Sequence, residues 1–235
     1  MRLDRYLSAS GLLSRREAAL AARAGRILLN GAPVRRVDMH IDEERDRVTL
    51  DGEEVGYRQY EYVWLNKPAG YVSATDDRSL PYVTELLSPV LQKKGLFPCG
   101  RLDRDTLGLM LLTNDGDLSH RLLSPRHHVE KVYAFCCEPP LPPRAEEAFS
   151  SGMTIGGEEC KPAVLICDEG RTSGRITLTE GKYHQVKRMT EALGSRITYL
   201  ERIAFAGIPL DSALARGEYR YATEEEIARL RAAND

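Results

Sequence analysis

The sequence lacks the features of a membrane or disulfide-stabilised protein. No apolar run approaches the roughly 20 residues that a membrane-spanning helix needs, and the N-terminus holds no apolar segment long enough for a secretory signal. The five cysteines are odd in number and show no CxxC spacing. We therefore expect a cytoplasmic protein with reduced, mostly buried thiols and no metal site.

Lysine is also missing from the start of the chain, where the first one is Lys67. Residues 1–37 carry eight arginines against two acidic residues, a balance of +6, whereas residues 38–56 carry two arginines against eight acidic residues, a balance of −6. The net charge of −2 hides this division. Because arginine binds phosphate in a fork geometry, the basic segment indicates RNA binding. A solvated charged face is the alternative explanation.

The patterns that are present predict an α+β protein with a small N-terminal domain. Strand and helix patterns alternate irregularly, without a repeating βαβ period, which favours a mixed, mainly antiparallel sheet. We predict a small RNA-binding domain over residues 1–56, a linker over 57–61 and a larger domain over 62–235. No heptad or long exposed apolar helix indicates more than a monomer.

Local signals define the elements of the N-terminal domain. Ser14 and Glu17 form a capping box that opens a helix ending near Gly25. A strand over 27–29 is followed by the turn signal Asn30-Gly31. In the larger domain we expect further elements at the following positions: strands at 62–65, 107–112, 131–135, 163–166 and 175–178, and helices at 82–87, 117–123, 142–149, 185–193 and after Thr223.

Residues 100–116 combine a charged loop with a buried strand. Asp103 stands between Arg101 and Arg104, directly before the apolar run 107–112. A carboxylate at the mouth of a rigid strand is suited to be a reactive group. The alternative is a polar loop with two surface ion pairs, each worth roughly 0–1 kcal/mol.

The N-terminal pattern resembles a known RNA-binding module. Arg2-Leu3-Asp4-x-x-Leu7, Ser14-Arg15, Gly25 and Asn30-Gly31 resemble the S4 module, which docks two helices and a loop onto structured RNA. By itself this resemblance implies a class of partner and no chemistry.

Three later segments resemble one enzyme family. They are Asn66-Lys67-Pro68-x-Gly70, Gly100-Arg101-Leu102-Asp103-x-Asp105-Thr106-x-Gly108-Leu109 and Glu180-Gly181-x-x-His184-Gln185-Val186-Lys187-Arg188-Met189. Behind an S4 module, in this order, they resemble the ribosomal pseudouridine synthases. The segments Ser124–Tyr133 and Lys161–Leu165 are most similar to the branch that acts on small-subunit (16S) ribosomal RNA.

The resemblance implies isomerisation of a uridine in RNA without a cofactor. Asp103 matches the essential aspartate, which acts as a nucleophile at the sugar or as a base that removes a sugar proton; the sequence leaves both open. Lys187 matches a cation that keeps Asp103 ionised. Tyr133 matches a tyrosine that stacks on the flipped base and assists proton transfer.

The resemblance also implies residues that contact RNA. Arg101 would enter the RNA stack when the target base leaves, and Leu178 would pack beside that base. The full set of expected RNA and base contacts is Arg2, Arg15, Arg16, Arg101, Arg104, Leu178, His184, Gln185 and Arg188. The expected partner is 16S ribosomal RNA, within a pre-ribosomal particle.

Three alternatives compete with this prediction. A sister enzyme would modify large-subunit RNA, and a non-catalytic S4-type assembly factor would only bind RNA. A carbohydrate-active hydrolase would use Asp103 together with Asp105, but two acids in one loop are poorly placed across a sugar cleft. Asp103, Tyr133 and Lys187 together favour the synthase.

Overall fold

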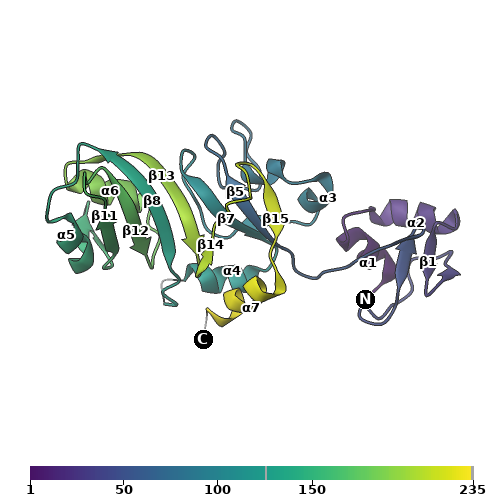
Figure 1. Ribbon diagram of the computed structural model, residues 1–235. Coiled ribbons are helices and arrows are strands. Elements are labelled where there is room, and N and C mark those ends of the chain that lie inside the picture. Colours follow the sequence, from purple (N-terminus) through teal and green to yellow (C-terminus); the bar gives the residue numbers. More distant parts are fainter. Residues whose placement is uncertain (125, 234–235) are drawn as a thin grey trace. The chain divides into compact units, whose positions relative to one another are not determined.

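The computed structural model describes residues 1–124 and 126–233. Within it the chain forms two compact units, each with its own core (Figure 1). The first unit comprises Met1–Glu61 and Leu87–Leu96, and the second comprises Tyr62–Leu86 and Phe97–Asp235.

The first unit contains three helices and a small antiparallel sheet. Its helices are α1 (Leu3–Ala9), α2 (Arg15–Arg23) and the short α3 (Pro89–Gln92), and its sheet has the order β2 (Ala32–Pro33), β1 (Ile27–Leu29), β3 (Val48–Leu50), β4 (Glu53–Glu54). The predicted capping box is present: the Ser14 Oγ accepts a hydrogen bond from the Glu17 amide, and the Ser14 amide donates to the Glu17 carboxylate. Asn30 and Gly31 both have positive φ, as a tight hairpin turn requires.

The second unit is built on a large mixed sheet. Its strands are, in spatial order, β11 (Val164–Cys167), β12 (Ser173–Leu178), β8 (Lys131–Glu138), β13 (Arg196–Phe205), β7 (Leu107–Thr113), β5 (Tyr62–Lys67) and β15 (Tyr219–Tyr221). The short strands β6 (Phe97–Pro98) and β14 (Ile208–Pro209) pair with β7 and β13, and β9 (Met153–Ile155) pairs with β10 (Glu158–Cys160) in a separate hairpin. Only the pair β13–β7 is parallel among the described strand pairs. This confirms the predicted α+β class with a mainly antiparallel sheet.

Helices cover the sheet in two places. Near β5 and β7 lie α4 (Gly116–Leu123) and α7 (Glu224–Ala232), whose apolar residues share one core with Trp64 and Leu111. At the other end, α5 (Ala145–Ser151) contacts β11, and α6 (Gln185–Ala192) contacts β13 and β9. A 3₁₀ helix occupies Val83–Leu86. No helix within the described residues is both long and apolar enough to cross a membrane.

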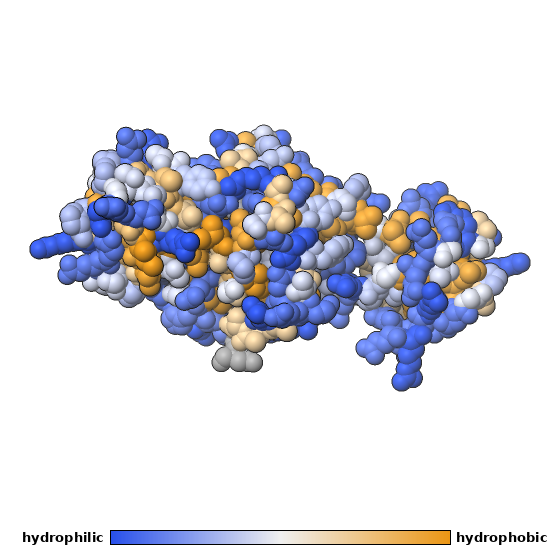
Figure 2. Space-filling model, in the orientation of Figure 1, coloured by the Kyte–Doolittle hydropathy of each residue, from blue (hydrophilic) through white to orange (hydrophobic). Residues whose placement is uncertain are grey.

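One face of the sheet is less covered than the other. Burial alternates along β8, where every second residue from Lys131 to Cys137 is buried. This is the pattern of an antiparallel strand with one face on a core. Figure 2 shows hydrophobic residues exposed among hydrophilic ones over β12, β8 and β13.

The structure corrects two of the expected elements and adds a strand that was not expected. Residues 142–144 precede α5, which begins at Ala145. The predicted helix at 82–87 is a single 3₁₀ turn. The ten-residue strand β13 was not predicted, although it lies at the centre of the large sheet.

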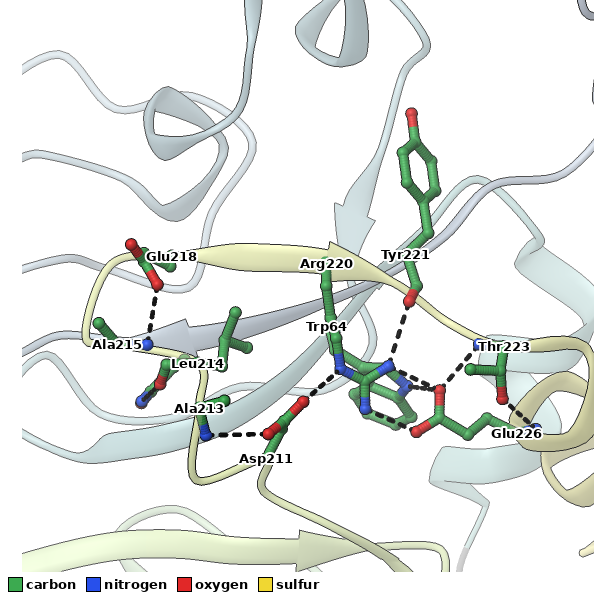
Figure 3. Close-up of polar contacts among 11 residues, drawn as sticks. Trp64, Asp211, Ala213, Leu214, Ala215, Glu218, Arg220, Tyr221, Thr223 and Glu226 are labelled. Atoms are coloured by element: carbon green, nitrogen blue, oxygen red, sulfur yellow. Dashed lines mark hydrogen bonds and ion pairs between the residues drawn. The ribbon is translucent and has the colours of Figure 1, made fainter.

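A network of charged groups joins the edge strand β15 to α7 (Figure 3). Arg220 donates two hydrogen bonds to Glu226, at 2.7 and 2.8 Å, and one to Asp211 at 3.2 Å. The Trp64 indole donates to the same Glu226 carboxylate at 3.2 Å. The hydrogen bonds from Arg220 lower the pKa of Glu226, so the carboxylate stays ionised. The C-terminal helix is thereby tied to two strands.

We expect Arg220→Met to lower the free energy of unfolding by about 1–2 kcal/mol, because Glu226 then loses its charged partner in a largely buried setting. Urea unfolding measures the change. The matched control is Arg229→Met, which breaks an exposed pair between Arg229 and Glu225 on the same helix and should cost less than about 0.5 kcal/mol. Equal losses in the two variants would contradict a structural role for the network.

Candidate active site

The loop before β7 is held at its start by one serine. The Ser73 Oγ accepts a hydrogen bond from the Leu102 amide at 2.9 Å and donates one to the Leu102 carbonyl at 2.7 Å. The backbone N–H and C=O of Leu102, the residue before Asp103, are therefore both satisfied by one side chain. This fixes the backbone from which the Asp103 side chain extends.

A buried lysine holds the same loop through its backbone carbonyls. Lys67 is fully buried, and its Nζ donates to the carbonyls of Pro68, Arg104 and Thr106 at 3.0, 3.2 and 2.8 Å. Burial lowers the pKa of Lys67 to about 8, and the nearby Asp105 and Asp103 oppose the shift. Three carbonyls thus converge on one ammonium, which closes the loop into a compact turn.

Glycine at position 108 allows the loop to enter the sheet. Gly108 has a φ of +99°, and a Cβ there would lie 2.3 Å from the Arg202 carbonyl oxygen of β13. Any side chain would force β7 and β13 apart. The close approach places the end of the loop beside the central strand.

Asp103 lies within a group of charges contributed by α6. One carboxylate oxygen is 2.9 Å from the Lys187 Nζ, and the other is 3.3 Å from the His184 Nε2. Lys187 also contacts Asp105 at 2.6 Å. Burial lowers the pKa of Lys187, but its hydrogen bonds to Asp105 and Asp103 outweigh this and leave the pKa raised. One ammonium with a raised pKa therefore faces two carboxylates.

The pKa of Asp105 shows the same balance. Burial raises it, and the hydrogen bond and charge of Lys187 more than offset that effect, so that the pKa lies below its usual range. Asp105 is exposed on 72% of its side chain, against 25% for Asp103. Of the two acids on Lys187, Asp103 is the one enclosed by protein.

A pocket opens beside Asp103. Its apolar wall includes Tyr133, Leu178 and Leu200, and its charged side includes Arg101 and Lys187. The register of β12 on β8 pairs Ile176 with Tyr133 and Leu178 with Lys131. Leu178 is therefore a diagonal neighbour of Tyr133 on the sheet. An apolar wall beside a carboxylate can hold a flat ring while the carboxylate faces a sugar.

Most of the residues expected in the site meet at this pocket. Asp103, Tyr133 and Lys187 all line it, and so do the residues Arg101, Leu178, His184 and Gln185. Gln185 is buried, and its amide donates to Glu180 at 2.7 Å. Its side-chain amide is thus engaged within the protein.

Two expected residues do not line the pocket. Arg188 contacts Glu158 and the Ile155 carbonyl, both at 2.8 Å, and so joins α6 to the β9–β10 hairpin. Arg104 is exposed, and its carbonyl accepts hydrogen bonds from Lys67 and Gly70. Arg188 therefore joins α6 to the β9–β10 hairpin, and Arg104 lies on the exposed side of the loop.

The N-terminal arginines lie in the first unit, and carboxylates pair with several of them. Arg2 makes a two-pronged contact with the buried Asp4, at 2.9 and 3.0 Å. Arg15 and Arg16 are exposed in the first turn of α2, with no carboxylate partner found among the described residues. Cations at a helix N-terminus add to the positive end of the helix dipole. The two arginines outnumber Glu17 in the same turn, which therefore carries a net positive charge.

Three residues at the site escaped the sequence analysis. Lys67 belongs to a motif noted there but received no role. Ser73 lies in a polar stretch without any pattern, and its contact with Leu102 spans 29 residues. Tyr183 precedes His184 in the third motif and stacks on its ring. The signals that the sequence offered were the motif positions of Lys67 and Tyr183; it offered none for Ser73.

Comparison with known proteins agrees with this geometry. Residues 61–192 match the family model described as RNA pseudouridylate synthase, and residues 1–48 match the S4 domain. The chain belongs to the RNA pseudouridylate synthase family. It is a pseudouridine synthase, an isomerase that converts uridine in RNA to pseudouridine.

Similar proteins cover the whole chain. The ribosomal small subunit pseudouridine synthase A of Escherichia coli is 44% identical over 232 residues, covering 97% of this chain and 99% of the relative. An uncharacterised RNA pseudouridine synthase of Bacillus subtilis is 44% identical over 231 residues, covering 97% of both chains. A crystal structure of a pseudouridylate synthase superposes with a TM-score of 0.69 at 36% identity, covering 98% of this chain and 99% of that one.

We expect the lowered pKa of Lys67 to be measurable as pH-dependent stability of the synthase. The pKa is about 8 in the folded state against an ordinary value of 10.5 for a lysine side chain. The unfolded state therefore binds more protons between these values, so stability rises with pH across that range. The free-energy cost of burying the charged Lys67 ammonium is present in full below pH 8 and is gone above pH 10.5.

Urea unfolding of wild type and Lys67→Met at pH 7, 8, 9 and 10 tests this. The free energy of unfolding of wild type, minus that of Lys67→Met at the same pH, should increase by on the order of 1–3 kcal/mol as the pH rises from 7 to 10. A constant difference would mean that the three carbonyls offset the burial and hold the pKa near its ordinary value.

Proposed function

We propose that this synthase isomerises one uridine of small-subunit (16S) ribosomal RNA, with Asp103 as the essential group. The observation that carries the proposal is the half-buried Asp103 carboxylate, 2.9 Å from the Lys187 ammonium at the mouth of an apolar-walled pocket. The names of the similar ribosomal small-subunit enzymes support the choice of RNA.

In the nucleophilic route, an Asp103 carboxylate oxygen forms a bond to C1′ as the bond from C1′ to N1 of uracil breaks. The electron pair of that bond leaves with the base, which turns within the pocket. C5 then bonds to C1′ and displaces the carboxylate. The proton on C5 is lost and N1 gains one, so the reaction needs no oxidant, reductant or cofactor. In the alternative route, Asp103 instead removes a sugar proton before the base is transferred.

Each neighbouring side chain has a role in this scheme. Lys187 pairs with the Asp103 carboxylate, which acts as an anion in both routes, and orients it toward the sugar. Tyr133 stacks on the flipped base and assists the proton transfer at C5, and Leu178 packs beside the same base. Arg101 occupies the space that the target leaves in the RNA stack. Because the uracil anion is delocalised and remains bound, no second carboxylate is needed.

We assign RNA binding and catalysis to different parts of the chain, because the basic segment lies at the N-terminus. Residues 1–56 bind structured RNA, residues 57–61 connect the parts, and residues 62–235 carry the chemistry. Base extraction costs a few kcal/mol, and phosphate contacts by arginines such as Arg15 and Arg16 supply binding energy for it. We place the protein in the cytoplasm, as a monomer acting on a pre-ribosomal particle.

The deciding experiment maps pseudouridine in 16S and 23S RNA from cells that lack this gene. One 16S site should disappear and return with wild type but not with Asp103→Asn, because the amide can neither attack C1′ nor remove a proton. The matched control is Asp105→Asn, which loses the other carboxylate on Lys187 and should restore the site. Purified Asp103→Asn should bind RNA nearly as well as wild type, since its shape is unchanged.

Each other outcome is informative. A lost site in 23S RNA would keep the chemistry and change the substrate to the large subunit. No lost site in either RNA would favour a non-catalytic assembly factor. If Asp103→Asn restored the site, Asp103 would not be the reactive group.

The role of the first unit is tested by charge reversal in α2. Arg15→Glu with Arg16→Glu should weaken RNA binding and flatten the dependence of log Kd on log salt concentration, because fewer counterions are released. Arg45→Glu with Arg47→Glu makes the same change in net charge within the acidic segment 38–56 and serves as control. Filter binding at several salt concentrations measures both. If the two pairs have the same effect, net charge alone accounts for the loss and α2 is not the contact.

A further inference from the structure

An exposed aromatic pair stands at the rim of the pocket. The rings of Tyr183 and His184 are stacked, with centroids 3.9 Å apart and planes inclined by 15°. Tyr183 is 76% exposed, more than any other large hydrophobic side chain in the described part of the chain. No hydrogen bond of its hydroxyl is found among the described residues. Tyr183 therefore contributes little to the core or to a polar network, and its outer ring face is open.

The pair is anchored to the reactive group. His184 lines the pocket, and its Nε2 is 3.3 Å from the Asp103 carboxylate. Its backbone is left-handed, with φ of 49° and ψ of 35°, at the N-cap of α6. That conformation is disfavoured for residues with a Cβ and persists only where the surroundings hold it. The Tyr183 ring is thus presented beside the pocket by a strained, fixed residue.

A fixed, open ring face suits a nucleobase. When one base leaves an RNA stack, its neighbours lose a stacking partner. Aromatic side chains replace such partners without regard to sequence, because every base has a π face. A ring already held by His184 loses little freedom when a base binds.

We propose that the outer face of Tyr183 is a stacking platform for the nucleobase next to the target uridine. The target enters the pocket between Asp103 and Tyr133, and one neighbour stacks on Tyr183 outside it. The inference deepens the proposed function and rests on it, because it takes the pocket as the place of the target base. It assigns to Tyr183 a part in holding the RNA and no part in bond making.

The test is a double-mutant cycle between protein and RNA. The full-length protein acts on a ribosomal RNA fragment that spans the mapped uridine, under single-turnover conditions at varied enzyme concentration. Two further fragments carry an abasic nucleotide on the 5′ or the 3′ side of the target. Tyr183→Ala should raise the half-saturating enzyme concentration on the intact RNA by about 5- to 100-fold and leave the saturating rate unchanged.

Controls separate stacking from other effects. Tyr183→Phe keeps the ring and should behave as wild type, whereas Tyr183→Leu keeps apolar bulk without the ring and should behave as Tyr183→Ala. Tyr221→Ala removes another exposed tyrosine, on β15, and should have no effect. Thermal unfolding shows whether each variant is folded.

The outcomes divide clearly. If the penalty of Tyr183→Ala disappears on one of the two abasic RNAs, Tyr183 stacks on that neighbour. If the penalty is absent on intact RNA, or equally large on both abasic RNAs, the platform is refuted. A lower saturating rate in Tyr183→Ala would show action through His184 on Asp103 and would also refute it. If wild type forms no pseudouridine in the fragment, the proposed function fails instead, without any change at Tyr183.

Discussion

The buried ammonium of Lys67 is the constraint on which the site depends. Its three carbonyl acceptors lie in two segments, at Pro68 and in the loop at Arg104 and Thr106. An ammonium without solvent must find such acceptors or lose its proton. The loop satisfies Lys67, and Lys67 in turn holds the loop in one shape. Ser73 adds a second hold at Leu102, so that both sides of Asp103 are fixed before any substrate binds.

The charged groups beside this loop hold the Asp103 carboxylate in place and contribute little to stability. Lys187 is shared between Asp103 and Asp105, and both pairs are at least partly open to water. Pairs of this kind add little to the free energy of unfolding. Their effect is that a carboxylate paired with an ammonium lines the pocket beside the apolar wall of Tyr133 and Leu178. Preorganised charge of this type costs no rearrangement at the moment of reaction.

Local signals predicted the elements that depend on local contacts. The capping box at Ser14, the turn at Asn30-Gly31 and the apolar run that forms β7 all lie where expected. The strand β13 was missed because its sequence mixes charged and apolar residues without a clear period. Its Arg202 is buried, donates to the Leu109 carbonyl at 2.7 Å and lies over the Phe205 ring. A buried arginine is stable there only because the neighbouring strand β7 supplies a carbonyl that accepts its hydrogen bond.

The sequence by itself determined the family, the α+β class and most residues of the pocket, because the motifs around Asp103 and Lys187 are long and ordered. Tertiary structure alone decided which charged side chains are free to act. Arg188 and Arg2 are engaged by carboxylates, whereas Arg15 and Arg16 have none among the described residues. It also decided that Lys67 and Ser73 support the loop and that the ring of Tyr183 is exposed. These properties arise from contacts between residues far apart in the chain, and no local pattern encodes such contacts.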